Sequence, residues 1–292
     1  MRKKARKMVT VFLTALLSVL VFVTGCGNQD AATTTSQPAG QASSTDSKAG
    51  GTLAKLREKG VLVVGSSNDT PFAFIDKDSK AFVGIDAEII TEIAKRLGIP
   101  KVEMKEVKFE NLLVELNNYN IDMVTDGMYI KPEREKIAAF TNPWYKEAEA
   151  LIVRNDSDIK GIDDLKDKVV GGQKGTTFLE YVQELKSQGK IKDVKIFGAQ
   201  TELLLALNTK KIDAVISDSA TSAYTIKHDP SLSIKLVSPY KSKYDGLVGA
   251  AVRKEDKELL DAINAELDKL KKEGFVLEVL KKYGLNEDNV VQ

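Results

Sequence analysis

Short apolar runs alternate with amphipathic runs over most of this chain. The run "GVLVVGSS" at residues 60–67 is apolar up to its two serines, which is typical of a buried strand. The stretch "DAEIITEIAKRLG" at 86–98 begins with Asp86, a residue type favoured at helix N-caps, and ends at Gly98. Its apolar residues share one helical face: Ile89, Ile90, Ile93, Ala94 and Leu97. Short apolar strands between amphipathic helices predict an α/β protein with largely parallel sheets.

A helix, a tight turn and a strand are predicted twice, 91 residues apart. The segment "LLVELNNYNIDMVTDG" at 112–127 matches "LLLALNTKKIDAVISD" at 203–218 in leucine, asparagine, isoleucine, aspartate and valine positions. Chance similarity between two amphipathic units is the alternative, and we favour two similar α/β lobes. Ligands of open α/β sheets bind beyond the carboxyl ends of the strands. Those ends are Asp126–Gly127 and Ser217–Asp218, and facing lobes would bring both to one cleft, a usual place for a small-molecule site.

One arginine in "DGMYIKPERE" (126–135) stands in an unexpected position. Pro132 is favoured at the first position of a helix, which places Arg134 in the first turn, where its charge opposes the helix dipole. Either Arg134 pairs with Glu135 or another surface acid, or it binds an anion that comes from outside. The residues alone leave both interpretations open.

The first 25 residues have the pattern of a secretory signal peptide. "MRKKARK" carries five basic residues, and the uncharged apolar run 8–23 follows. A membrane anchor is the rival, but 16 residues are short for a hydrocarbon core of ~30 Å. The next motif, "VTGC", resembles the lipobox of bacterial lipoproteins, which implies a lipid on Cys26; an incidental thiol is the alternative. Residues 27–51 contain no large apolar side chain, so we predict that 26–51 is the lipidated cysteine and a flexible tether.

The composition excludes several function classes. Of 292 residues, 42% are hydrophobic and 29% are charged, as in an ordinary globular protein. Removing residues 1–25 leaves 38 basic and 42 acidic residues, a net charge of −4, which does not favour nucleic-acid binding. One cysteine and one histidine, His228, allow no internal disulfide and no His/Cys metal cluster. With neither a G-x-S-x-G motif nor a Walker loop, we expect no enzyme, no cofactor and no metal.

From about residue 62 to residue 285 the chain resembles the family 3 bacterial solute-binding proteins, the polar amino-acid receptors of ABC importers. The resemblance rests on the order and spacing of several motifs: "PFAF…FVGIDAEIITEIAKRLG", "GMYIKPEREKIAAFTNPWY", "DDLKDKVVGGQKGTT", "KKIDAVISD" and "VRKEDKELLDAINAELDKLKKEGFVLEVLKKYG". It implies two α/β lobes joined by crossing strands near 145–148 and 245–249, with the ligand trapped when the lobes close. Lobe 1 is then 52–146 with 247–292, and lobe 2 is 147–246.

The resemblance also implies roles for individual residues. Arg134 would bind the α-carboxylate of an amino acid in a fork of two hydrogen bonds, and Asp218, from the other lobe, would accept its α-ammonium. A surface ion pair and a local turn are the respective alternatives. The remaining candidates line the same site: Thr176 and Thr177 on the carboxylate, Gly127 and Tyr129 beside the arginine, Phe109 as an aromatic wall or a core residue, and Asp126 at the strand end.

The chain departs from the family pattern at two places. "SSNDTPF" offers Asn68 and Asp69 where an aromatic residue is expected, so Asp69 either contacts a polar or cationic ligand group or caps the turn. Lys131 replaces the usual helix-capping threonine. We therefore predict a monomeric, lipid-anchored receptor on the extracytoplasmic face of the membrane that delivers an amino acid to ABC permease subunits. The alternatives are a receptor for ectoine, which lacks the primary ammonium that Asp218 would bind, and a dehydratase-like enzyme on the same fold, which would need a buried acid such as Asp69 with a raised pKa.

Overall fold

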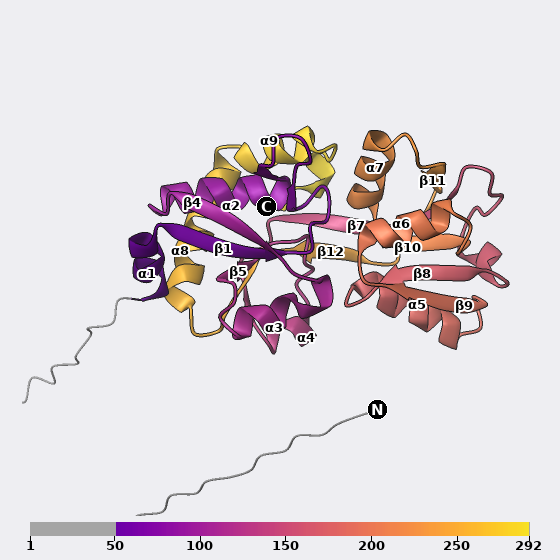
Figure 1. Cartoon of the computed structure of the whole chain (residues 1–292), viewed down its shortest axis with the longest axis horizontal. Helices are drawn as coiled ribbons and strands as arrows, with labels where there is room; N and C mark the ends of the chain where they lie inside the picture. Colours follow the sequence, from indigo (N-terminus) through magenta and orange to yellow (C-terminus); the bar gives the residue numbers. More distant parts are fainter. Residues whose placement is uncertain (1–50, 292) are drawn as a thin grey trace, which may run out of the picture. The chain divides into compact units, whose positions relative to one another are not determined.

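The computed structural model describes residues 51–291, which form two α/β lobes, each with its own sheet (Figure 1). We call the part of the chain around the five-stranded sheet lobe 1 and the part around the six-stranded sheet lobe 2. The predicted signal peptide, the predicted lipid site at Cys26 and nearly all of the predicted tether lie outside the described residues. Within 51–291, no helix combines the length and the apolar character that a membrane span requires.

Lobe 1 contains a mixed sheet in the strand order β4-β1-β5-β13-β6, in which β1 pairs in parallel with β4 and β5, and β13 is antiparallel to both β5 and β6. Its strands are β1 (Val61–Ser66), β4 (Lys101–Glu106), β5 (Met123–Val124), β6 (Ala139–Phe140) and β13 (Ala251–Val252), with a small hairpin of β2 (Phe74–Ile75) and β3 (Phe82–Val83). Its helices are α1 (Thr52–Lys59), α2 (Ile85–Arg96), α3 (Leu112–Asn117), α4 (Pro132–Glu135), α8 (Lys257–Lys272) and α9 (Phe275–Lys282).

Lobe 2 has the same plan, with the strand order β9-β8-β10-β7-β11 and β12 paired with β7. Here β8 is parallel to β9 and β10, and β7 is antiparallel to β10 and β11. Its strands are β7 (Tyr145–Arg154), β8 (Val169–Gln173), β9 (Asp193–Phe197), β10 (Ala214–Asp218), β11 (Ile234–Leu236) and β12 (Asp245–Val248). Its helices are α5 (Thr177–Ser187), α6 (Gln200–Asn208) and α7 (Ser219–His228). Residues 51–291 also contain three 3-10 turns, in both parts of the structure: Phe109–Asn111, Ile162–Leu165 and Glu287–Asn289.

The internal repeat predicted from the sequence is confirmed in detail. The leucines at its helical positions 112, 116, 203 and 207 are all fully buried. The carboxylate of Asp122 accepts a hydrogen bond from Val63 N at 3.0 Å, and that of Asp213 accepts one from Val169 N at 2.9 Å. Each aspartate therefore ties the start of its strand to the neighbouring parallel strand, which gives this polar residue a structural reason to recur in a buried unit.

Two antiparallel strands connect the lobes. The first part of β7 pairs with β12, from Tyr145 opposite Val248 to Ala148 opposite Asp245. The remainder of the same strand pairs with β10 and β11 inside lobe 2. Trp144 and Tyr145, where β7 leaves lobe 1, are completely buried. The connection is therefore continuous with the lobe 2 sheet rather than a separate flexible linker.

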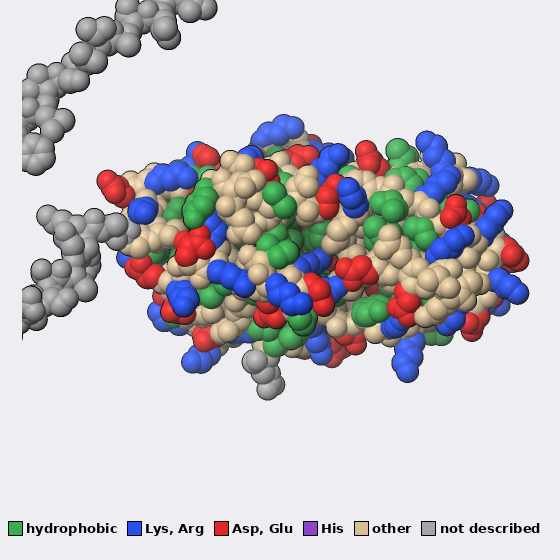
Figure 2. All heavy atoms as spheres, turned by 90° about the horizontal axis from the view of Figure 1, so that it is seen from below, with side chains coloured by type: hydrophobic (Ala, Val, Ile, Leu, Met, Phe, Trp, Pro, Cys, Tyr) green, Lys and Arg blue, Asp and Glu red, His purple; other side chains and the backbone are tan. Residues whose placement is uncertain are grey.

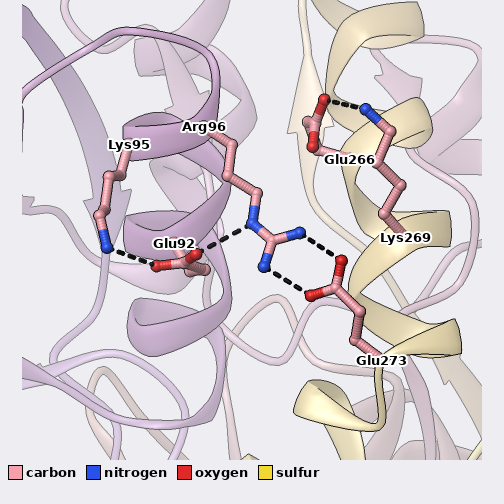
Figure 3. A network of polar contacts seen from close by, with 6 residues as sticks. All are labelled: Glu92, Lys95, Arg96, Glu266, Lys269 and Glu273. Atoms are coloured by element: carbon pink, nitrogen blue, oxygen red, sulfur yellow. Dashed lines mark hydrogen bonds and ion pairs between the residues drawn. The ribbon is translucent and has the colours of Figure 1, made fainter.

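The two chain segments of lobe 1 are held together by both apolar and polar contacts. Helix α2 packs against α8 and α9 around a shared core in which Ile89, Ile93, Leu259 and Ile263 are fully buried. On the surface, Figure 3 shows Arg96 of α2 between Glu92 of its own helix and Glu273 at the end of α8. The Arg96 guanidinium donates to both oxygens of Glu273, at 2.8 and 2.6 Å, the fork geometry that arginine forms best with a carboxylate.

One local prediction about α2 is wrong. Asp86 does not cap the helix: the N-cap is Gly84, and the Asp86 side chain is 1% exposed. Its carboxylate instead accepts hydrogen bonds from Gly127 N at 2.8 Å and from the hydroxyl of Tyr145 at 2.7 Å. A residue type common at helix starts serves here as a buried acceptor between distant parts of lobe 1.

Candidate functional site

The carboxyl ends of strands from both lobes meet at a small cavity that opens partly to solvent. The parallel strands β1 and β5 of lobe 1 and β8 and β10 of lobe 2 all end there, as expected for sheets of this kind. The structure brings all nine predicted site residues to its wall: Asp69, Phe109, Asp126, Gly127, Tyr129, Arg134, Thr176, Thr177 and Asp218. Three residues that the sequence reasoning missed line it as well: Phe72, Gln173 and Phe178.

Arg134 takes part in no ion pair within residues 51–291, so the surface pair with Glu135 is not formed in this structure. Its guanidinium donates to two carbonyl oxygens instead, Tyr129 O at 2.8 Å in lobe 1 and Gly175 O at 3.0 Å in lobe 2. It also lies 5.5 Å from the centre of the Phe109 ring. Burial lowers the pKa of Arg134, because a charged group is less stable away from water. A cation held by neutral oxygens in a cavity is well placed to bind an anion.

The helix dipole that matters at this site belongs to lobe 2. Helix α4, which contains Arg134, has four residues, so its dipole is small and the conflict expected from the sequence is weak. Helix α5 has eleven residues and begins at Thr177, which lines the cavity together with Phe178. The backbone N–H groups that a helix leaves unbonded at its start therefore lie at the cavity wall, where they favour an anion.

The two threonines before α5 have different roles. The Thr176 hydroxyl is the N-cap: it accepts from Leu179 N at 3.2 Å and donates to Gln173 O at 2.8 Å. The Thr177 hydroxyl is buried and has no hydrogen-bond partner within the part of the chain that the structure describes. Thr176 shapes the loop, and Thr177 is the hydroxyl that remains available at the cavity.

Two carboxyl groups of lobe 1 face the cavity side by side. The hydroxyl of Ser67 lies 2.7 Å from Asp69 Oδ2 and 2.5 Å from Asp126 Oδ2. Burial raises the pKa of Asp126 well above its ordinary value, and the charge of Asp69 adds to this shift. Burial also raises the pKa of Asp69, against the hydrogen bonds from Ser67 and from Gln173 of lobe 2. The Asp69 side chain therefore accepts a hydrogen bond from the other lobe and does not cap its own turn. In that turn it is the side chain of Asn68 that accepts a backbone hydrogen bond, from Ile75 N.

Asp218 brings a third carboxyl group to the cavity, from the end of β10 in lobe 2. It occupies the N-cap position of α7 but makes no capping hydrogen bond. The pKa of Asp218 is raised well above its ordinary value, first by burial and then by the negative charges of Glu147 and Asp69. A carboxylate in this environment is stabilised by a cation from outside.

Aromatic rings close the remaining walls. Phe72 stacks on Tyr145, with 6.3 Å between ring centres, and Tyr129 of lobe 1 meets Phe178 of lobe 2 edge to face at 5.6 Å. The Tyr129 hydroxyl is buried without a hydrogen-bond partner within residues 51–291. Gly127 adopts a positive φ of 61°, and a side chain there would lie 2.6 Å from the Phe72 ring. Close packing of backbone and ring therefore requires glycine at this position.

Of the three cavity residues that were not predicted, Gln173 could have been identified from the sequence. Gln173 is the last residue of β8, and the rule that ligands bind beyond the carboxyl ends of strands applies to it as it does to Asp126 and Asp218. Phe72 and Phe178 are apolar residues whose position at a cavity depends on how the lobes pack, which no local pattern reveals.

The arrangement separates opposite charges across one small cavity. Arg134 and the start of α5 favour an anion, and Asp218, Asp69 and Asp126 favour a cation. Within residues 51–291, no group of three histidine, cysteine, aspartate or glutamate side chains is arranged to hold a metal ion. The geometry suits a small molecule that carries both charges, enclosed by contacts from both lobes.

Comparisons with known proteins agree with this description. The family model of bacterial extracellular solute-binding proteins, family 3, matches residues 62–286. The L-cystine-binding protein TcyJ of Escherichia coli (strain K12) is 29% identical over 236 residues, which cover 80% of this chain and 86% of that protein.

Two solved structures are similar over nearly their whole length. A mutant of ArgBP from T. maritima has a TM-score of 0.71 at 33% identity and covers 79% of this chain and 98% of its own. The ancestral amino acid-binding protein AncCDT-1, described as a precursor of cyclohexadienyl dehydratase, has a TM-score of 0.71 at 30% identity. It covers 80% of this chain and 99% of its own.

Proposed function

The chain belongs to the family 3 bacterial extracellular solute-binding proteins, and on this premise we propose that it captures a polar amino acid between its two lobes for delivery to an ABC importer. The single observation that carries the proposal is the separation of charge across the cavity. Arg134 lies on the wall formed by lobe 1, and Asp218 lies on the wall formed by lobe 2. An α-amino acid carries a carboxylate and an ammonium at adjacent positions, so it complements both walls.

The mechanism follows from the contacts of these groups. Lobe 1 receives the carboxylate through Arg134, which exchanges its bonds to carbonyl oxygens for two charge-assisted bonds. Closure then adds the start of α5, the Thr177 hydroxyl and the carboxylate of Asp218. Binding is cooperative between the lobes because neither half-site alone compensates both charges of the ligand.

The location and the anchor are part of the same proposal. An extracytoplasmic location is what membership of this extracellular family implies. The basic and apolar segment 1–25 supports a signal peptide, and "VTGC" supports a lipid on Cys26. Several acyl chains would make the anchoring stable, which one chain would not. The receptor would act as a monomer on a tether, with the permease subunits as its protein partners.

Two substitutions test the proposed site. We expect Arg134→Ala and Asp218→Ala each to lower amino-acid affinity about 10²- to 10³-fold, because each leaves one charge of the enclosed ligand unpaired. Isothermal titration calorimetry of the purified full chain measures the affinity, and circular dichroism checks that the variants are folded. Lys136→Ala and Asp78→Ala remove the same charges from exposed positions and serve as matched controls. Unchanged affinity in both site variants would show that the site is elsewhere.

A dehydratase-like enzyme is the second candidate, because buried carboxyl groups with raised pKa values face the cavity. Such groups are what a general acid requires. Incubation with prephenate or arogenate, followed by absorbance of an aromatic product, distinguishes the two functions. We expect no product, and a turnover that Asp69→Asn abolishes would establish the enzyme instead. Ectoine belongs in the titration panel, since a response to ectoine alone would contradict the role given to Asp218.

A further inference from the structure

The carboxyl groups at the cavity outnumber what a neutral zwitterion needs. Three of them line it, Asp69, Asp126 and Asp218, against one guanidinium, Arg134. A zwitterion would pair with Arg134 and Asp218 and leave the other two carboxyl groups uncompensated. On the face of the molecule drawn in Figure 2, positive and negative side chains are interspersed. The imbalance in the cavity is therefore a local feature of the site, and it does not extend over that face.

The excess of negative charge in the cavity remains even if Asp69 and Asp126 share one proton. The Ser67 hydroxyl has a single proton and lies within hydrogen-bond distance of Asp69 and Asp126 at once. It can donate to one carboxylate, and the other short contact is favourable if a carboxyl proton points at the serine oxygen. A pair that shares one proton still carries one negative charge. With Asp218 and Arg134 included, the site then has a net charge of −1.

The two aspartates are not equally accessible. Asp126 is 2% exposed, and both of its oxygens are engaged, Oδ1 by the Ser66 hydroxyl at 2.8 Å and Oδ2 by Ser67 N and the Ser67 hydroxyl. Asp69 is half-buried, and its Oδ2 accepts from Ser67 and from Gln173 at 3.1 Å. Its Oδ1 has no hydrogen-bond partner within residues 51–291. Asp69 Oδ1 is therefore the carboxylate oxygen that is left to accept a hydrogen bond from a ligand, and Asp126, with both oxygens engaged, is a positioning residue.

Two buried hydroxyl groups point independently to a polar ligand in the same cavity. The side chains of Tyr129 and Thr177 are 5% and 7% exposed, line the cavity, and leave their hydroxyl oxygens without a partner in the described part of the chain. Buried polar atoms normally have a hydrogen-bond partner, which an enclosed polar ligand would supply.

We propose that the cargo is a cationic amino acid, whose distal positive group binds Asp69 Oδ1 while Asp126, through Ser67, holds Asp69 in place and adds to the attraction. The inference rests on the proposed function, because it assigns the α-carboxylate to Arg134 and the α-ammonium to Asp218. A cationic amino acid has a net charge of +1, which balances the site. A neutral ligand leaves the negative charge of Asp69 and Asp126 uncompensated when the lobes close, and an acidic ligand adds a further negative charge that they repel.

The test compares arginine and lysine with glutamine and glutamate, by calorimetry on the purified full chain. We expect arginine or lysine to bind at least about 10-fold more tightly than glutamine, and glutamate to bind more weakly still. Asp69→Asn should lower the affinity for the cationic ligand about 10- to 100-fold, the loss typical of one hydrogen bond to a charged group, with little change for glutamine. Asp78→Asn, on the exposed neighbouring loop, is the control for the loss of one negative charge.

The role of Asp126 has a separate readout. Asp126→Asn should reduce the preference for the cationic ligand over glutamine, whereas damage to the fold would lower both affinities equally. The inference is overturned if glutamine or glutamate binds as tightly as the cationic ligands, or if Asp69→Asn weakens all ligands alike. Glutamine that binds as tightly as arginine and lysine, and that loses its affinity in Arg134→Ala, would overturn this inference and leave the proposed function standing. Failure of every amino acid to bind would overturn both.

Discussion

The buried carboxyl group of Asp86 connects three parts of lobe 1, and its replacement by asparagine should change how stability depends on pH. Asp86 stands in the first turn of α2 and accepts hydrogen bonds from Gly127 at the ligand cavity and from Tyr145 at the start of β7. Asparagine has nearly the same shape and keeps one carbonyl acceptor, but it cannot ionise. The substitution therefore separates the charge of Asp86 from its size.

The size and the sign of the effect follow from the pKa of Asp86. Burial raises this pKa from 3.8 to about 6, against the two hydrogen bonds. Between these values the folded state binds the proton more tightly than the unfolded chain does. The stabilisation from the Asp86 proton is thus fully present below about pH 4 and is lost as the pH rises through about 6. A shift of about two units corresponds to ~3 kcal/mol in the free energy of unfolding.

Asparagine loses part of the hydrogen bonding at every pH, which we expect to cost about 1–3 kcal/mol. Asp86→Asn should therefore be less stable than the wild type at pH 4 and should gain ~3 kcal/mol relative to it by pH 7. Urea unfolding at pH 4, 5, 6 and 7 measures this difference through the fluorescence of Trp144, the single tryptophan, which is fully buried. Asp78→Asn, in an exposed loop, is the control. A difference that stays constant from pH 4 to pH 7 would refute the reasoning.

Two further substitutions test the packing at the cavity. Gly127→Ala would force a side chain onto a backbone with φ 61°, within 2.6 Å of the Phe72 ring, so thermal melts should show a loss of about 2–4 kcal/mol. Gly161→Ala, where no atom lies within 4 Å of an added Cβ, should change stability little. Lys131→Ala removes the 2.5 Å ion pair with Glu180 across the lobes; because Glu180 is 62% exposed, calorimetry should show at most about a fivefold loss of affinity. A much larger loss would mean that Lys131 contacts the ligand directly.

Periodicity and repetition predicted the fold well because both are local properties of the chain. The apolar face of 86–98 became α2, and the run at 60–67 became β1. The matched segments at 112–127 and 203–218 predicted two similar lobes, and the structure shows that even their aspartates make equivalent bonds. A repeated polar residue inside a buried unit is therefore informative, since it preserves a hydrogen bond that each lobe needs.

The ends of the strands and the spacing of the motifs predicted which residues lie at the site, but not the contacts that depend on how distant parts of the chain pack. All nine candidate residues lie at one cavity, because the carboxyl ends of parallel strands in two facing lobes converge. The misassigned residue, Asp86, shows the limit. A side chain that caps its own helix and one that accepts from an amide 41 residues away have the same local sequence pattern. Likewise, only the packing of the lobes brings Gln173 to Asp69.

The interrupted path of the chain through lobe 1 has a consequence for the order in which the protein is made. Strand β13 lies between β5 and β6 in the lobe 1 sheet, yet it follows the whole of lobe 2 in the sequence. A ribosome therefore releases every element of lobe 2 while the lobe 1 sheet still lacks an internal strand and while α2 still lacks α8 and α9. Lobe 2 can complete its core during synthesis, since domains generally fold as units in the order in which they emerge. Lobe 1, which carries Arg134, must keep β6 and one edge of β5 unpaired until β13 arrives. In that interval its exposed strand edges are where a chaperone would be needed.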